Sequence, residues 1–196
     1  MFHAIRKNLI SMVLGWVVPL TFMAASAAFS AEIPHQISGL DLVTGKSETI
    51  ALSSAQRATV IVFLSTRCPC SASHQAVLNQ IAGEFGAQGI RMVGVHSNAN
   101  ESQEEAMAYF SVAKLAFPVI QDPRTVLADR FEAFKTPHAY IVGPKLEILF
   151  QGGVDNSKIY ERATQHYLRD ALSEIVQGRL PREKTVRVVG CQIQRP

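Results

Sequence analysis

Residues 65–71, which read Ser-Thr-Arg-Cys-Pro-Cys-Ser, are the most informative stretch of this chain. They follow an apolar run at residues 60–64 that is typical of a buried strand, and they lead into residues 71–85, whose pattern predicts a helix. Cys68 is therefore expected at a strand-to-helix corner, with Pro69 at the first helical position, where helices favour proline. The free N–H groups and the positive end of the helix dipole then face the sulfur. Such a setting lowers the pKa of a thiol from about 8.5 to roughly 3.5–7.5, and the thiolate is the reactive form.

The first 31 residues have the pattern of a secretory signal peptide. Arg6 and Lys7 precede an apolar core, and small residues, mostly alanine and serine, follow from position 24 onwards. This pattern predicts cleavage between residues 27 and 31, export from the cytoplasm, and a periplasmic or other extracytoplasmic location. An uncleaved leader of this length is also compatible with a membrane anchor, which would be the protein's one contact with a membrane.

Removal of the leader takes away Arg6 and Lys7 and no acidic residue, which leaves 17 basic against 16 acidic side chains. The basic character of the whole chain is thus partly a property of the leader. Without a clustered basic face, the sequence does not favour nucleic-acid binding. Residues 32–196 have the length of one compact domain with its own core.

All three cysteines, Cys68, Cys70 and Cys191, lie after the leader. In an oxidising compartment an odd number leaves at least one thiol unpaired within the chain. A domain held together by disulfides would use more cysteines in a shorter chain. The cysteines therefore indicate redox or metal chemistry.

Strands and helices are expected to alternate along residues 32–196. A hairpin is expected within residues 33–52, with its turn at 44–46. The further expected strands are 59–64, 90–96, 117–120, 138–142, 148–150 and 186–189. The expected helices are 71–85, 101–115 (capped by Asn100), 124–134 and 160–176. This order predicts an α/β three-layer fold, with a mixed central sheet and helices on both faces.

The order of elements and the residues at the corner together resemble the thioredoxin-like superfamily, and within it the exported redoxin branch related to alkyl hydroperoxide reductases and thiol-specific antioxidants (AhpC/TSA, peroxiredoxin-like). The matching segments are residues 63–69 (FLSTRCP), Thr136-Pro137 before a strand, residues 150–156 (FQGGVDN), and the closing Gly-Cys-Gln-Ile at 190–193. The resemblance covers the whole domain after the leader. It implies a cis bond between Thr136 and Pro137, close to Cys68.

The chain also departs from its relatives at the corner. Thioredoxins have two cysteines separated by two residues, whereas Ser71 stands at the second position here. Peroxiredoxins have proline and threonine seven and three residues before the reactive cysteine, where this chain has Ile61 and Ser65. The resemblance therefore implies a thiol-dependent oxidoreductase without a prosthetic group, in which disulfide exchange is favoured over efficient peroxide reduction. Its partners would be protein thiols or disulfides, with peroxide left open as a further substrate.

The thiol that resolves a mixed disulfide with Cys68 is left open between two candidates. If Cys68 and Cys70 share the first helical turn, their side chains point about 200° apart, and a bond between them would be strained. Cys191 in the C-terminal tail is the better candidate partner, although a cysteine beside valines and isoleucine is also compatible with a small buried apolar residue. Arg67 is a candidate source of positive charge near Cys68.

Two other functions are compatible with the same residues. Soft thiolates favour Cu(I), so Cys68 and Cys70 with a histidine, His138 after the proline or His74 on the helix, form a candidate copper site of a copper-binding chaperone. The fold also occurs in modules that only bind a partner, for which the loop at residues 152–156 is a candidate, although its glycines and Asp-Asn are equally typical of a turn.

Overall fold

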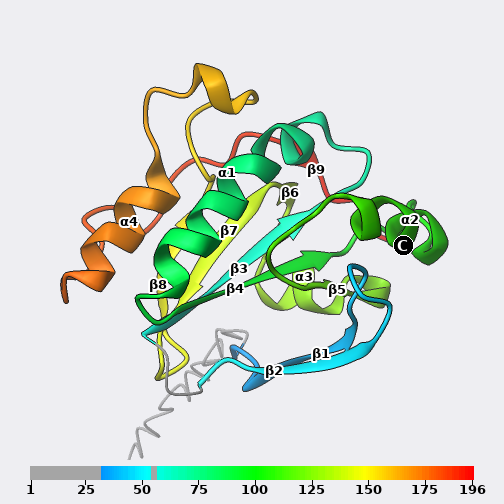
Figure 1. Ribbon diagram of the computed structural model, residues 1–196, viewed down its shortest axis with the longest axis horizontal. Coiled ribbons are helices and arrows are strands. Elements are labelled where there is room, and N and C mark those ends of the chain that lie inside the picture. Colours follow the sequence, from blue (N-terminus) through cyan, green and yellow to red (C-terminus); the bar gives the residue numbers. More distant parts are fainter. Residues whose placement is uncertain (1–31, 54–56) are drawn as a thin grey trace, which may run out of the picture. The chain divides into compact units, whose positions relative to one another are not determined.

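The computed structural model describes residues 32–53 and 57–196, so the predicted leader lies outside the described residues. A five-stranded mixed sheet in the order β5-β4-β3-β7-β8 forms its centre (Figure 1). These strands are β3 (Ala58–Leu64), β4 (Ile90–His96), β5 (Val119–Gln121), β7 (His138–Val142) and β8 (Ile148–Gly152). Strands β3, β4 and β5 are parallel, whereas β7 is antiparallel to both β3 and β8. The predicted α/β fold with a mixed central sheet is confirmed.

Strand β3 is buried on both faces, which explains its uninterrupted apolar sequence. Val60 and Val62 pack with helix α1 (Pro69–Gly86), helix α2 (Gln103–Val112) and helix α4 (Tyr167–Val176). Ile61 and Phe63 face the opposite cluster, which contains residues of helix α3 (Val126–Arg130) and of the N-terminal hairpin. The sheet therefore lies between two apolar layers, and this arrangement brings the carboxyl end of β3 to the start of α1.

The predicted hairpin is present as β1 (Gln36–Leu40) and β2 (Ser47–Ala51). Its turn uses Gly45 in the left-handed region, at φ 71°, where a side chain would be strained. Asp41 also ties the hairpin to the sheet, because its carboxylate accepts a hydrogen bond from the N–H of Val119.

Several predicted elements differ from the observed ones. Helix α2 begins at Gln103 and is capped by Ser102, whose hydroxyl accepts the N–H of Glu105, so the prediction of Asn100 as the cap is wrong. The segment predicted as one helix at 124–134 is a 3₁₀ turn, η1 (Pro123–Thr125), followed by the short α3. The predicted helix at 160–176 is likewise divided into η2 (Tyr160–Arg162) and α4. Among the described residues no helix is long and apolar enough to cross a membrane.

The C-terminal tail was predicted to form a strand at residues 186–189, and this prediction is wrong. The tail instead forms the two-residue strand β9 (Cys191–Gln192), which pairs antiparallel with β6 (Lys135–Thr136). Further backbone contacts hold the tail beyond β9: Ile193 donates to the carbonyl oxygen of Phe134, and Ala99 donates to that of Gln194. This pairing fixes the position of Cys191, which no local pattern indicated.

Gly190 allows the tail to approach β6 closely. A Cβ atom at this position would lie 2.1 Å from the carbonyl oxygen of Thr136, which is far below van der Waals contact. We therefore predict that Gly190→Ala displaces β9, lowers the free energy of unfolding by about 1–3 kcal/mol, and slows formation of any disulfide that uses Cys191. The matched control is Gly83→Ala within α1, where a Cβ meets nothing within 4 Å. That variant should be stabilised by roughly 0.5–1 kcal/mol. Urea denaturation measures both changes, and equal stability of the two variants would contradict the assigned role of Gly190.

Candidate functional site

Cys68 lies where the sequence predicts it, between the end of β3 and the first turn of α1. It is the N-cap of α1, with extended backbone angles (φ −88°, ψ 111°), and Pro69 is the first helical residue. The Cys68 sulfur accepts a hydrogen bond from the N–H of Ser71 at 3.4 Å. In its protonated form the thiol donates to the carbonyl oxygen of Thr136 at 3.0 Å. The sulfur is thus held between a helix N-terminus and the β6 backbone.

The bond between Thr136 and Pro137 is cis, which confirms the expectation drawn from the family resemblance. It follows β6 directly, and Thr136 is the residue that pairs with Cys191 in β9. Thr136 therefore contacts both cysteines through its backbone, one by a hydrogen bond to the sulfur and the other by strand pairing. Two segments far apart in sequence meet at this residue.

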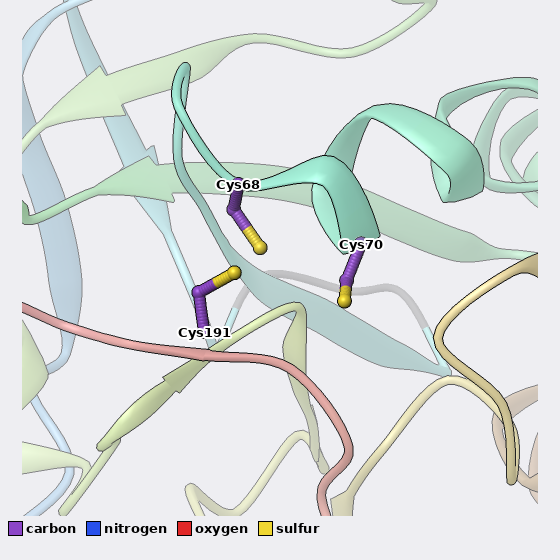
Figure 2. Close-up of side chains that lie close together, drawn as sticks. All are labelled: Cys68, Cys70 and Cys191. Atoms are coloured by element: carbon purple, nitrogen blue, oxygen red, sulfur yellow. The ribbon is translucent and has the colours of Figure 1, made fainter.

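The sulfur atoms of Cys68, Cys70 and Cys191 all lie within 4.8 Å of one another. Figure 2 shows the three side chains pointing into the same space from the α1 corner, the first turn of α1 and the tail. We call these residues the thiol cluster. Cys68 and Cys70 do not diverge as they would within one helical turn, because Cys68 has non-helical backbone at the N-cap. No disulfide is present among the described residues, and all three thiols are free.

Cys68 ionises most readily of the three thiols. Burial opposes ionisation, but hydrogen bonds from the Cys191 thiol, from the Thr136 side chain and from the N–H of Ser71 outweigh it and lower the pKa of Cys68 to about 7. Burial and the neighbouring Cys68 raise the pKa of Cys191 to about 12 and also raise that of Cys70. At neutral pH a substantial fraction of Cys68 is therefore ionised, and this thiolate is stabilised by the Cys191 thiol, which remains protonated.

Arg67 does not supply the positive charge that the sequence analysis suggested. Its exposed guanidinium forms a bidentate pair with Glu105, at 2.6 and 2.7 Å. The hydroxyl of Ser65 is likewise engaged elsewhere, because it donates its hydrogen to Glu101. The low pKa of Cys68 thus comes from hydrogen bonds rather than from a neighbouring cation.

Glu101 organises the loop before Cys68. The sequence pattern did not indicate this role, because it predicted Glu101 only as the first residue of a helix. Its buried carboxylate accepts hydrogen bonds from the hydroxyl of Ser65, from the N–H and hydroxyl of Thr66, and from Nε2 of His96 at 2.9 Å. Burial opposes ionisation of this group, but these donors lower its pKa to about 2. The sequence signal was an acidic residue shortly after the histidine that ends a buried strand.

A second buried pair lies beneath the first turns of α1. Nε2 of His74 lies 2.9 Å from a carboxylate oxygen of Asp155, and Nδ1 lies 2.7 Å from the carbonyl oxygen of Cys70. Both ring nitrogens face acceptors, which favours the imidazolium form. Burial opposes protonation of His74, but these hydrogen bonds raise its pKa. Asp155 belongs to the loop at 152–156, so this loop anchors α1 and its key side chain is buried rather than available to a partner.

The copper site predicted from Cys68, Cys70 and His138 is not assembled. Ala139 and Ile141 of β7 face the apolar layer that contains helix α1. Because side chains alternate along a strand, His138 lies on the opposite face of the sheet, together with Tyr140. There its ring contacts Phe134 and Tyr140, and burial lowers its pKa to about 4. His74 is also occupied, as described above. Within the described ranges, the metal-capable group at this site consists of the thiol cluster and contains no histidine.

Comparisons with known proteins agree with this fold. The model of the AhpC/TSA family matches residues 31–151, which is more than half of the chain. A search of the curated proteins finds no match.

Solved structures share the fold over most of the described domain. An uncharacterized conserved protein from Geobacillus kaustophilus is 25% identical, with a TM-score of 0.73, over 84% of this chain and 90% of that one. A hypothetical protein from Sinorhizobium meliloti 1021 is 23% identical, with a TM-score of 0.72, over 82% of this chain and 91% of that one. A putative thiol:disulfide interchange protein DsbE from Chlorobium tepidum is 18% identical, with a TM-score of 0.52, over 61% and 81% of the respective chains. The fold is that of the thioredoxin-like redoxins.

We predict that Cys68 titrates with a midpoint near pH 7, because its folded pKa is about 7. The thiolate absorbance in the ultraviolet, taken as the difference between the wild type and Cys68→Ser, measures this midpoint. Cys191→Ala removes the largest stabilising hydrogen bond and should move the midpoint upwards, towards the usual value of about 8.5. Arg67→Ala is the matched control and should leave the midpoint unchanged, since Arg67 pairs with Glu105. A midpoint near 8.5 in the wild type would refute the assigned hydrogen-bond network.

We also predict that the Glu101 carboxylate stabilises the fold in a pH-dependent way. Its pKa is lowered to about 2, so its contribution is complete above the unfolded value near 4.5 and is lost as the pH falls from there towards 2. Glu101→Gln should lower the free energy of unfolding by about 3 kcal/mol at pH 7, and the difference from the wild type should shrink below pH 4.5. Urea denaturation at several pH values tests this, with the exposed Glu161→Gln as control. A difference that is independent of pH would argue against the buried carboxylate.

Proposed function

This chain belongs to the AhpC/TSA family, and we propose that it is an exported thiol–disulfide oxidoreductase in which Cys68 is the nucleophile. One observation carries the proposal. The Cys68 sulfur, capping α1 and stabilised as a thiolate near neutral pH, lies in hydrogen-bond contact with the Cys191 thiol. An ionised attacker and a second thiol within reach are the two groups that disulfide exchange requires. The signal-peptide pattern supports export, because an oxidising compartment is where such exchange takes place.

The first step is attack of the Cys68 thiolate on one sulfur of a client disulfide. A bond forms between Cys68 and that sulfur, the client S–S bond breaks, and the other client sulfur leaves as a thiolate that takes up a proton. The helix N-terminus and the N–H of Ser71 hold the attacking sulfur in its ionised form. The product is a mixed disulfide between Cys68 and the client.

Cys191 is the better group to resolve the mixed disulfide. Once Cys68 is bound to the client it carries no negative charge, so one cause of the raised pKa of Cys191 disappears. Cys191 then loses its proton and attacks the Cys68 sulfur. The Cys68–Cys191 disulfide forms and the second client sulfur departs as a thiol. The client disulfide is reduced and the pair is oxidised, and the same steps in reverse oxidise a client dithiol.

Cys70 is less suited to this step, although its sulfur is also within 4.8 Å. It lies in the first turn of α1, two residues from Cys68, with the rigid ring of Pro69 between them. A disulfide across such a short loop is strained and is easily reduced. Cys191 lies instead on a separate strand, which is paired with β6, and its thiol is already in hydrogen-bond contact with the Cys68 sulfur.

Disulfide exchange is favoured over efficient peroxide reduction because the candidate hydrogen-bond donors near the sulfur are engaged by other residues. Peroxide cleavage needs hydrogen-bond donors aimed at the oxygen atoms that take up charge. The hydroxyl of Ser65 and the guanidinium of Arg67 are the candidates before Cys68, but they donate to Glu101 and Glu105 respectively. Peroxide thus remains a secondary substrate class in this proposal, and protein thiols and disulfides are the main partners.

We predict that mild oxidation of the purified chain links Cys68 to Cys191, as identified by peptide mapping under non-reducing conditions. Cys68→Ser should reduce the rate of reduction of a model protein disulfide by at least about 100-fold, because it removes the nucleophile. Cys191→Ser should accumulate the mixed disulfide with the client, whereas the matched Cys70→Ser should turn over and accumulate none. A dominant Cys68–Cys70 link, or accumulation in Cys70→Ser alone, would assign the resolving role to Cys70. Full activity of Cys68→Ser would refute the proposal.

A further inference from the structure

We propose that the fully reduced thiol cluster binds one Cu(I) ion through the sulfur atoms of Cys68, Cys70 and Cys191. This site differs from the one that the sequence suggested, since the third ligand is a sulfur from the tail rather than an imidazole. It does not depend on the redox function, because a cluster of three thiols binds a soft ion whether or not it exchanges disulfides.

The first argument is the spacing of the sulfurs. A metal–thiolate bond is about 2.3 Å long, so three sulfurs placed in a plane around one ion are about 4.0 Å apart. The three sulfurs of the cluster already lie within 4.8 Å of one another without any metal. Small side-chain rotations therefore suffice to close the site, and the backbone need not move.

The second argument is the direction from which each ligand comes. Cys68 and Cys70 project from the start of α1, and Cys191 projects from β9 on the other side of the space that they share (Figure 2). Cys68 and Cys70 are 2% and 5% exposed, so most of the site is shielded from water, and the partly exposed Cys191 leaves one side open for entry of the ion. A buried ligand set held by a helix and a paired strand is largely preorganised.

The third argument is the chemistry of the donor set, which selects the ion. Thiolates favour Cu(I), zinc and iron–sulfur clusters, whereas the oxygen ligands that magnesium and calcium require are missing from this group. Structural zinc is almost always bound by four protein ligands, and the group supplies three. The nearest imidazole on α1, that of His74, is held by Asp155 and the Cys70 carbonyl. Three sulfurs satisfy Cu(I), which has no need of a fourth ligand.

Metal binding and disulfide formation exclude each other at this site. A Cys68–Cys191 disulfide leaves neither sulfur free as a thiolate, so the oxidised chain retains Cys70 as its one remaining ligand. The fully reduced chain presents all three. Cu(I) binding is thus expected to be confined to the reduced state and to protect the thiols from oxidation.

The test is a titration of the reduced full chain with Cu(I) in the absence of oxygen, with bicinchoninate as the competing chelator. The expected result is withdrawal of one Cu(I) per chain from the chelator. X-ray absorption at the copper edge should then show three sulfur neighbours at about 2.3 Å. Cys191→Ser should retain two sulfur neighbours and lose at least about tenfold in affinity. Cys70→Ser should behave in the same way, and the disulfide form of the wild type should bind no Cu(I).

His138→Phe is the matched control, because it keeps a buried ring beside Phe134 and Tyr140 and removes the imidazole. It should bind Cu(I) as the wild type does, and circular dichroism verifies that each variant is folded. The proposal is overturned if the wild type withdraws no Cu(I), if Cys191→Ser binds as tightly as the wild type, if His138→Phe loses the ion, or if zinc displaces Cu(I). Disulfide exchange by the same preparation is assayed without metal, so failure of Cu(I) binding and failure of the proposed redox function are distinguished.

Discussion

The backbone of Thr136 is the constraint on which the site depends. Its carbonyl oxygen lies 3.0 Å from the Cys68 sulfur, and its pairing with Cys191 attaches the C-terminal tail to the same point. Residues separated by 68 and 55 positions are thereby brought together at one two-residue strand. Without this pairing Cys191 would no longer be held beside Cys68, and Cys68 would lose the thiol that most strongly stabilises its ionised form.

Charged groups behind the site hold its loops in place without touching the sulfurs. The Glu101 carboxylate gathers four donors and fixes the residues that lead to Cys68. The His74–Asp155 pair joins α1 to the loop after β8. Buried charges of this kind are tolerated because their hydrogen bonds are satisfied. The rigid frame they provide matters for both proposals, since disulfide exchange and Cu(I) binding each require sulfurs at fixed separations.

Patterns within short stretches of sequence determined the scaffold and the position of Cys68. The apolar residues of β3 and the spacing of apolar residues along α1 are local signals, and they located the strand, the helix and Cys68 at the corner between them. Strands β4 and β7 were predicted with their observed bounds for the same reason. The family resemblance, which also rests on local motifs, correctly implied the cis bond before Pro137.

Only the tertiary structure decided which side chains complete the site. Cys191 joins Cys68 through the β6–β9 pairing, which involves two residues on each strand and leaves no periodic pattern. Side chains alternate along β7 between the two apolar layers on either side of the sheet. His138 lies on the face opposite to helix α1, and it is therefore kept away from the cysteines. Glu101 and Asp155 were inconspicuous because a buried acid reveals itself only by the distant donors that surround it. Local order in a chain follows from neighbouring residues, whereas the composition of a site depends on contacts between residues far apart in sequence.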